Sequence, residues 1–248
     1  MAHIDAGHTM EIHEVKGRLY GVGLGPGDPE LLTLKAARLI RSAKFVAYPE
    51  PEGGESFARS IAADFIAGGA VEIPIPIPMD ESRFPAQRVY DRAAAEISEV
   101  LRSGSDVVAI CQGDPFFYGS FMYLFSRLTE RYSVSIVPGV SSLAACAAVA
   151  ARPLCARIET LSVLPAPMPA EELERRLRVC GAAAIIKLGR HMPKVKSVLR
   201  RLDLFDNSVF VAHATLPTQR VEPLATSPEA APYLSMILIP GSDPYGSA

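Results

Sequence analysis

Apolar and polar residues in the first half of the chain alternate between short apolar runs and helical patterns. Apolar runs predict strands at 44–48, 71–75, 106–111 and 134–137. Apolar residues at helical spacing predict helices over 31–43, 55–66 and 84–102, and an alanine-rich helix is expected to end near Ala151. Strand, loop and helix recur with Gly and Pro at the strand exits, which is typical of a parallel α/β sheet.

The second half of the chain predicts a smaller α/β unit that is richer in strands. Its helical patterns cover 171–178 and 193–202. Its apolar runs are 160–164, 182–188, 208–212, 220–225 and 233–239. Pro153 and the mixed residues through Glu159 mark a boundary. We therefore expect a flexible arm over 1–17, one domain over 18–155 and a second over 156–248.

Prolines alternate with isoleucines at the end of the strand predicted at 71–75, where Pro74, Pro76 and Pro78 follow one another at every second position. Proline has no amide hydrogen to donate to a neighbouring strand. We expect the chain to leave the sheet at these prolines.

Four glycines at alternate positions, Gly21, Gly23, Gly25 and Gly27, separate an apolar Leu-Tyr pair from a helical pattern. Without a Cβ atom, such a loop can take positive φ angles and lie close to a bound molecule. The spacing differs from the dinucleotide-binding fingerprint, because its sixth position is Pro26. An ordinary tight turn between strand and helix is the alternative.

Two further loops follow predicted strands, at 112–120 and 138–142. In parallel sheets, ligands bind at the carboxyl ends of the strands. The three loops together therefore predict one binding site.

Composition excludes several classes of function. The chain of 248 residues is 49% hydrophobic with a formal net charge of −2, which disfavours nucleic-acid binding. The longest apolar run, 143–151, is too short to span a bilayer, and the four scattered cysteines predict reduced thiols in a cytoplasmic protein. His3, His8 and His13 are expected on the arm, either as a mobile leader or as part of a metal site; without a carboxylate or cysteine cluster we predict no metal.

The segment 23–33, Gly-Leu-Gly-Pro-Gly-Asp-Pro-Glu-Leu-Leu-Thr, and the later Gly113-Asp114-Pro115 resemble the two signatures of the tetrapyrrole (corrin and porphyrin) methyltransferase family. The resemblance spans about 18–240 and implies two α/β domains. The first has a mostly parallel sheet and the second a smaller mixed sheet, with S-adenosyl-methionine in the cleft between them. It also implies a homodimer. Within the family, 113–124 and 187–191 are most similar to the precorrin-2 C20-methyltransferases of cobalamin biosynthesis.

The resemblance also assigns the cofactor contacts. It implies that the cofactor lies against the first loop and places its methionine end on the backbone of the second. The implied residues are Gly25, Pro26, Gln112, Gly113, Asp114, Ser141, Ser142, Leu188 beside the adenine, and Ala214. Main-chain groups and small side chains suit a polar cofactor with many donors and acceptors.

The substrate end departs from the family in one place. Some relatives that act on uroporphyrinogen carry an arginine where this chain has Ser120, so any proton-transfer role is unassigned. The candidate catalytic residues, expected to contact the macrocycle, are Asp114, Tyr118, Ser120 and Tyr123. The alternatives are turn capping for Asp114 and packing in the core or at the rim for the two tyrosines.

The substrate implied by the resemblance carries many carboxylates, which local cations must meet. The candidates are Arg152, Arg157, Lys187, Arg190 and Arg220, and for each of them a solvated surface position is the alternative.

Other functions stay open on sequence alone. Relatives that methylate ribosomal RNA or a translation factor lack the full first signature. A non-catalytic tetrapyrrole-binding or cofactor-binding module is favoured only by Ser120. The sequence does not decide between precorrin-2 and its cobalt-loaded counterpart as the substrate.

Overall fold

The computed structural model describes residues 16–78 and 83–241, with side chains described outside 83–86. Contacts divide these residues into two compact units. The first unit runs to Val22 and adds 37–111 and 120–137; the second holds 23–36, 112–119 and the chain from Pro138 on. The histidines of the expected arm lie outside the described residues, and a domain boundary at 155 stays a prediction.

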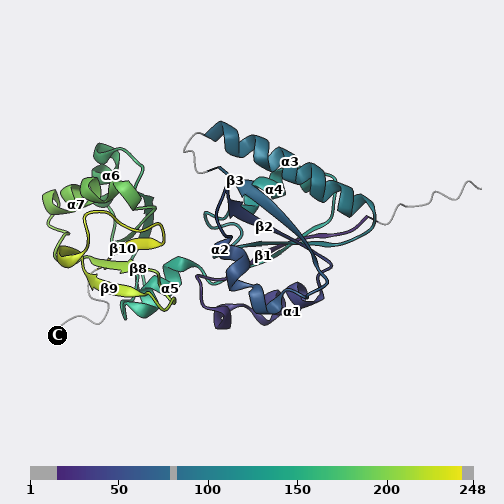
Figure 1. Ribbon diagram of the computed structural model, residues 1–248. Coiled ribbons are helices and arrows are strands. Elements are labelled where there is room, and N and C mark those ends of the chain that lie inside the picture. The colour runs from purple at the N-terminus through teal and green to yellow at the C-terminus, as the bar shows by residue number, and fades with distance from the viewer. Residues whose placement is uncertain (1–15, 79–82, 242–248) are drawn as a thin grey trace, which may run out of the picture. The chain divides into compact units, whose positions relative to one another are not determined.

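A parallel five-stranded sheet forms the centre of the first unit (Figure 1). Its central strand β4 (Val107–Cys111) continues into the second loop. The neighbouring strand β1 (Leu19–Gly23) continues into the first loop, and β5 (Val134–Val137) at the edge continues into the third. The strand order is β3 (Val71–Ile77), β2 (Phe45–Pro51), β4 (Val107–Cys111), β1 (Leu19–Gly23), β5 (Val134–Val137).

The expectation that the chain leaves the sheet at the prolines is wrong for Pro74 and Pro76; the strand ends at Ile77, before Pro78. Strand β3 continues through Pro74 and Pro76 to Ile77 and pairs with β2 along its whole length. It lies at the edge of the sheet, where every second residue directs its backbone away from the neighbouring strand. Proline is tolerated at those positions, while Ile73 and Ile75, which alternate with the prolines, are buried.

Helices cover both faces of this sheet, α3 and α4 on one side and α1 and α2 on the other (Figure 1). Ser56 is the N-cap of α2, as expected, and accepts a hydrogen bond from the Arg59 amide at 3.1 Å. The helix expected from Leu31 begins only at Leu34, after a 3₁₀ turn capped by Asp28. The sequence analysis did not predict α4. The helices are α1 (Leu34–Ser42), α2 (Phe57–Ile61), α3 (Arg83–Arg102) and α4 (Phe121–Leu128).

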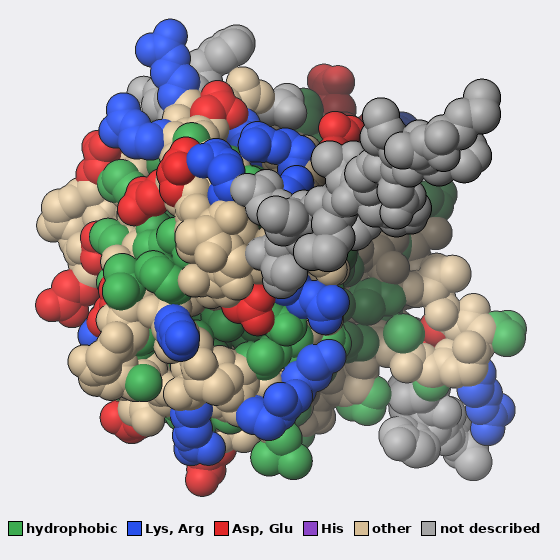
Figure 2. All heavy atoms as spheres, turned by 90° about the vertical axis from the view of Figure 1, so that its right-hand side faces the viewer, with side chains coloured by type: hydrophobic (Ala, Val, Ile, Leu, Met, Phe, Trp, Pro, Cys, Tyr) green, Lys and Arg blue, Asp and Glu red, His purple; other side chains and the backbone are tan. Residues whose placement is uncertain are grey.

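Charged side chains of both signs are mixed on the face in Figure 2, where Lys and Arg lie among Asp and Glu. Arg102 pairs with Glu99 at 2.7 Å, and Arg127 pairs with Asp91 at 2.7 Å. Exposed pairs of this kind add little stability. The mixture agrees with the small net charge of the whole chain.

The second unit is built on a mixed five-stranded sheet in which β6–β7 is parallel and the other pairs are antiparallel. Its strand order is β6 (Leu161–Pro165), β7 (Ala182–Ile186), β10 (Ser235–Ile239), β8 (Val209–Ala212), β9 (Arg220–Pro223). The described part of this unit also contains the α-helices α5 (Ser142–Val149), α6 (Ala170–Leu177) and α7 (Met192–Arg201).

Alternation along β7 divides the core of the second unit between the two faces of its sheet. Ala183 and Ile185 belong to the cluster that includes residues of α6 and α7. Ala184 and Ile186 point to the other face and pack with residues of α5. One face is therefore filled by two helices, and the other carries α5 and the beginning of the pocket described below.

Tyr48, Glu72 and Arg59 form a polar network in the first unit that joins β2, β3 and α2. Arg59 donates to both carboxylate oxygens of Glu72, at 2.8 and 2.9 Å, which lowers the pKa of that carboxyl. Burial of the Tyr48 phenol and its hydrogen bond to Glu72 raise the tyrosine pKa from 10.0 to about 12. The folded state thus holds the phenol proton more tightly than the unfolded chain does.

This network predicts alkaline destabilisation. Tyr48 contributes stability that is fully present below pH 10 and is lost as the pH rises toward 12, because the unfolded phenol ionises first. When the pH is raised from 9 to 11, the free energy of unfolding measured in urea should fall by about 1 kcal/mol less in Tyr48→Phe than in the parent protein. Parallel losses in the two proteins would contradict the assignment.

Candidate functional site

Glycines let the three predicted loops approach one another backbone to backbone. Gly25 and Gly113 exchange two hydrogen bonds, at 3.2 and 2.7 Å. A Cβ on Gly139 would lie 2.1 Å from the Gly113 carbonyl oxygen, and one on Gly23 would lie 2.5 Å from the same atom. Side chains are excluded at these contacts, so the three loops pack directly against one another. We call this contact the glycine junction (Gly23, Gly25, Gly113 and Gly139).

Asp114 fixes the second loop to the third. One carboxylate oxygen accepts hydrogen bonds from the amides of Phe116 and Phe117, at 2.9 and 3.1 Å, and the other accepts one from Gly139 at 3.1 Å. The carboxylate is thus occupied by backbone donors. Of the two alternatives for Asp114, the geometry favours turn capping.

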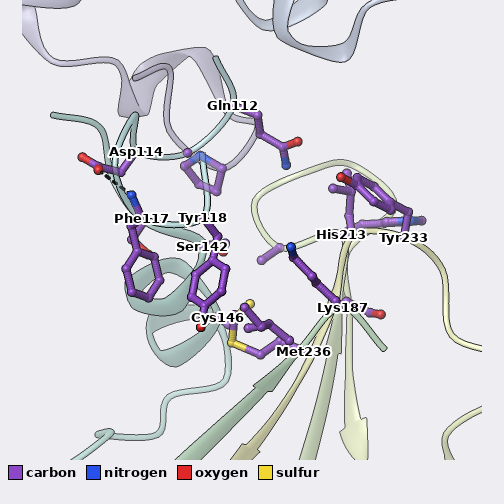
Figure 3. A pocket seen from close by; sticks show the side chains of 17 residues that line it. Gln112, Asp114, Phe117, Tyr118, Ser142, Cys146, Lys187, His213, Tyr233 and Met236 are labelled. Atoms are coloured by element: carbon purple, nitrogen blue, oxygen red, sulfur yellow. Dashed lines mark hydrogen bonds between the residues drawn. The ribbon is translucent and has the colours of Figure 1, made fainter. Parts of the chain in front are cut away.

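A pocket in the second unit lies beside the glycine junction, and many of the expected residues line it (Figure 3). Ser141 caps α5, accepting from the Leu143 amide at 3.1 Å, and Ser142 is the first residue of that helix. Gly113 has a φ of +68°, and a Cβ added to it would have no atom within 4 Å, so its open side faces free space. The expected residues that line the pocket are Pro26, Gln112, Gly113, Asp114, Tyr118, Ser141, Ser142 and Ala214.

The remaining candidates lie elsewhere. Gly25 belongs to the junction and not to the pocket lining, and Leu188 is fully buried in the core with α7. Ser120 and Tyr123 belong to the first unit. There Ser120 lines a small, mostly apolar cavity, and the half-exposed Tyr123 ring lies 4.9 Å from that of Tyr90.

Of the basic residues expected to bind substrate carboxylates, one lines the pocket and the others do not. Lys187 lines the pocket, whereas Arg220 is paired with Glu222 at 2.7 Å. Arg152 lines a different groove of the second unit, formed by 150–155 and 204–209 among others. Arg157 and Arg190 are exposed and do not line the pocket.

Several lining residues were missed by sequence reasoning. Cys146 lies one helical turn after Ser142, so helical periodicity from that serine would have found it. Met236 and its neighbours 233–235 enter through antiparallel pairing of β10 with β7 and β8, which the sequence does not reveal. Ile186 and His213 follow from the ends of these two partner strands.

Three non-glycine residues of the pocket have a left-handed backbone. Tyr118, Lys187 and His213 have φ angles of 56°, 58° and 51°. This conformation is uncommon for residues with a side chain, and such strain gathers at ligand-binding and catalytic sites. Its concentration here supports the pocket as the functional site.

The pocket combines an apolar floor with polar walls. Figure 3 shows Cys146 and Met236 at one end and Lys187 extending into the cavity. Burial raises the pKa of Cys146 to about 12, so this thiol stays protonated and does not act as a nucleophile. Ser141, Ser142 and Gln112 contribute polar side-chain atoms to the lining. A mixed lining of this kind suits a nucleoside with a polar tail.

Neither a metal-binding cluster nor a membrane-spanning helix occurs among the described residues. No group of three or more His, Cys, Asp or Glu side chains is placed to hold a metal ion there. Within the same part of the chain, no helix is long and apolar enough to cross a bilayer.

Comparison with known proteins places this site in a family. The model for the tetrapyrrole (corrin/porphyrin) methylases matches residues 18–229, which include all three loops. The chain belongs to the tetrapyrrole methylase family. The two segments that resemble the family's sequence signatures contribute Gly23, Gly25 and Gly113 of the glycine junction and the carboxylate of Asp114, and the third loop contributes Gly139.

Individual relatives agree with this family. The chain is 41% identical to the cobalamin biosynthesis protein CobIJ of Mycobacterium tuberculosis over 91% of this chain and 46% of that protein, so it spans about half of that relative's length. It is 36% identical to a precorrin-2 C(20)-methyltransferase of a Sinorhizobium species, over 91% of this chain and 96% of that one.

A solved structure shows the same fold. The uroporphyrin-III C-methyltransferase of Thermus thermophilus, complexed with S-adenosyl homocysteine, aligns with a TM-score of 0.65. The two chains are 25% identical, over 90% of this chain and 97% of that one.

The junction predicts intolerance of any side chain at Gly139. Gly139→Ala places a Cβ 2.1 Å from the Gly113 carbonyl oxygen and 2.9 Å from two backbone atoms of Gly23, so the backbone must shift, which should cost about 3 kcal/mol in urea unfolding. Gly54→Ala is the matched control, because its Cβ would make only an ordinary 3.4 Å contact with a proline side chain. Equal stability of the two variants would show that the loops separate easily.

Proposed function

We propose that this tetrapyrrole methylase transfers a methyl group from S-adenosyl-methionine to C20 of precorrin-2, giving precorrin-3A in cobalamin biosynthesis. The observation that carries the proposal is the near full-length match to the Sinorhizobium enzyme, which covers 96% of that protein. The cofactor is supported independently by the structural relative that was solved with S-adenosyl homocysteine.

The residues of the pocket fit this cofactor. The open side of Gly113 leaves a space that a Cβ would fill, and Ser141, Ser142 and Ala214 have small side chains. Both main-chain groups of Gly113 bond to Gly25, so this glycine contributes room and not a free donor. We assign the adenosine to the apolar floor at Cys146, Ile186 and Met236.

The protein's main catalytic contribution is positioning. When bound, S-adenosyl-methionine would supply an electrophilic methyl group on a sulfonium; in-line attack by the acceptor carbon breaks the methyl–sulfur bond and releases the neutral thioether S-adenosyl homocysteine, so neither acid catalysis nor a Lewis acid is needed. Holding donor and acceptor carbon in line in a water-poor pocket then supplies most of the rate enhancement. The glycine junction and the Asp114 clamp keep the loops rigid for this purpose.

For the substrate we retain three contacts as proposals. Tyr118 lines the pocket and is half exposed, which suits contact with a macrocycle. Ser120 and Tyr123 stay candidates because they follow the second loop directly in the sequence. Asp114 is reassigned from substrate contact to loop positioning, because backbone amides occupy its carboxylate.

Two alternatives differ in substrate or in turnover. Cobalt-loaded factor II, or another tetrapyrrole, is the second substrate candidate, since it offers the same methylation position and the same carboxylates. A binding module without turnover is favoured only by Ser120 in the place of an arginine.

We further propose a homodimer in the cytoplasm. Dimerisation is an expectation from the family. The location is supported by Cys111, Cys146, Cys155 and Cys180, which are all free thiols.

The proposed reaction is tested by incubating the protein with S-adenosyl-methionine and either precorrin-2 or its cobalt-loaded form. We expect metal-free precorrin-2 to gain one methyl group in place of one hydrogen, which is lost as a proton, and the new methyl group to be located at C20 by NMR with ¹³C-labelled cofactor. Faster methylation of the cobalt form would select the second substrate. Binding of both ligands without a mass gain would reject catalysis.

The cofactor site predicts a specific loss in Gly113→Ala. The added Cβ fills cofactor space, so the affinity for S-adenosyl homocysteine should fall at least about tenfold by calorimetry. Gly53→Ala is the matched control. Gly53 has a φ of +73° and nothing lies within 4 Å of its Cβ, so the substitution causes the same backbone strain. Gly53 belongs to the first unit and does not line the pocket. Equal affinities in the two variants would remove Gly113 from the cofactor site.

A further inference from the structure

Two charged residues, Lys187 and Asp114, line the pocket, and their side chains contact different groups. Lys187 follows β7, and its side chain extends into the cavity (Figure 3). The ammonium lies 5.3 Å from the centre of the Tyr118 ring, and no salt bridge between described residues involves it. Asp114, which also lines the pocket, has its carboxylate occupied by backbone amides.

The backbone on both sides of this contact is strained. Tyr118 and Lys187 have φ angles of 56° and 58°, where glycine or asparagine would be favoured. A lysine in this conformation directs its side chain into the pocket at the expense of local stability. Retained strain at a ligand-lining position points to a role in binding.

A cation held over an aromatic face keeps its full charge. The ring attracts the ammonium through its quadrupole but donates no counter-charge, unlike a carboxylate partner. An anion that enters the pocket therefore meets a positive charge already in place, with less side-chain entropy to lose.

We propose that Lys187, held over the Tyr118 ring, binds a carboxylate of the molecule in the pocket. The inference rests on the proposed function, because both the methionine part of the cofactor and the tetrapyrrole carry carboxylates. The chemistry is the same for the two sources, and binding measurements separate them.

The test compares Lys187→Met, which keeps length but removes charge, with Lys187→Arg, which keeps the charge. Exposed Lys44→Met, in the first unit, is the matched control. Calorimetry gives the affinities for S-adenosyl homocysteine and for 5′-methylthioadenosine, which lacks the amino-acid carboxylate. Fluorescence titration gives the affinity for uroporphyrin, a stable polycarboxylate macrocycle.

If Lys187 binds the carboxylate of the cofactor, the Lys187→Met variant binds S-adenosyl homocysteine about tenfold more weakly, and its affinity for methylthioadenosine is unchanged. If the macrocycle is the source, only uroporphyrin binding weakens by that factor. In either case Lys187→Arg restores most of the affinity, and Lys44→Met changes neither ligand.

Unchanged affinity for both carboxylate ligands in Lys187→Met overturns the proposal, as does an equal loss for methylthioadenosine. Lys187→Asn, which suits the left-handed backbone, repeats the measurement should the methionine variant unfold. These assays need no turnover, so a carboxylate site at Lys187 and a failure to methylate precorrin-2 are distinguishable results.

Discussion

The close approach of three backbone loops at the glycine junction is the constraint on which the rest of the site depends. Loops that follow neighbouring strands β4, β1 and β5 meet there without side chains between them, joined by the paired hydrogen bonds of Gly25 and Gly113. Asp114 adds the third connection through the Gly139 amide. This arrangement fixes where Gly113 opens toward the pocket and where α5 begins, because Ser141 follows Gly139 by two residues.

The glycine junction belongs to the second unit, and the sheet and α5 of the same unit form the other walls of the pocket. The sheet presents Ile186 and Met236 from adjacent antiparallel strands, while α5 contributes Cys146 on the same face. Tyr118 and Lys187, which follow a loop and a strand, have a left-handed backbone and line the cavity. The site is thus made mainly of backbone, small side chains and an apolar floor, as expected for a reaction in which positioning dominates.

Most of the fold was predictable from sequence, since nearly every predicted apolar run became a strand. The prolines of β3 misled because their effect depends on whether a strand lies at an edge, and sheet order is not local information. The signature loops were also predictable. Met236 was missed, because strand pairing decides which side chains face a pocket. Leu188 is fully buried in the core with α7, and its place beside the adenine stays a prediction.

The central claim is that the glycine junction and the adjoining pocket hold the cofactor. Hydrogen–deuterium exchange with and without S-adenosyl homocysteine tests it most directly. The account predicts slower exchange on binding at 112–118, 140–146 and 234–236, which line the pocket or continue from its lining residues. Protection confined to the separate groove at 150–155 and 204–209, with no change in these segments, would contradict it.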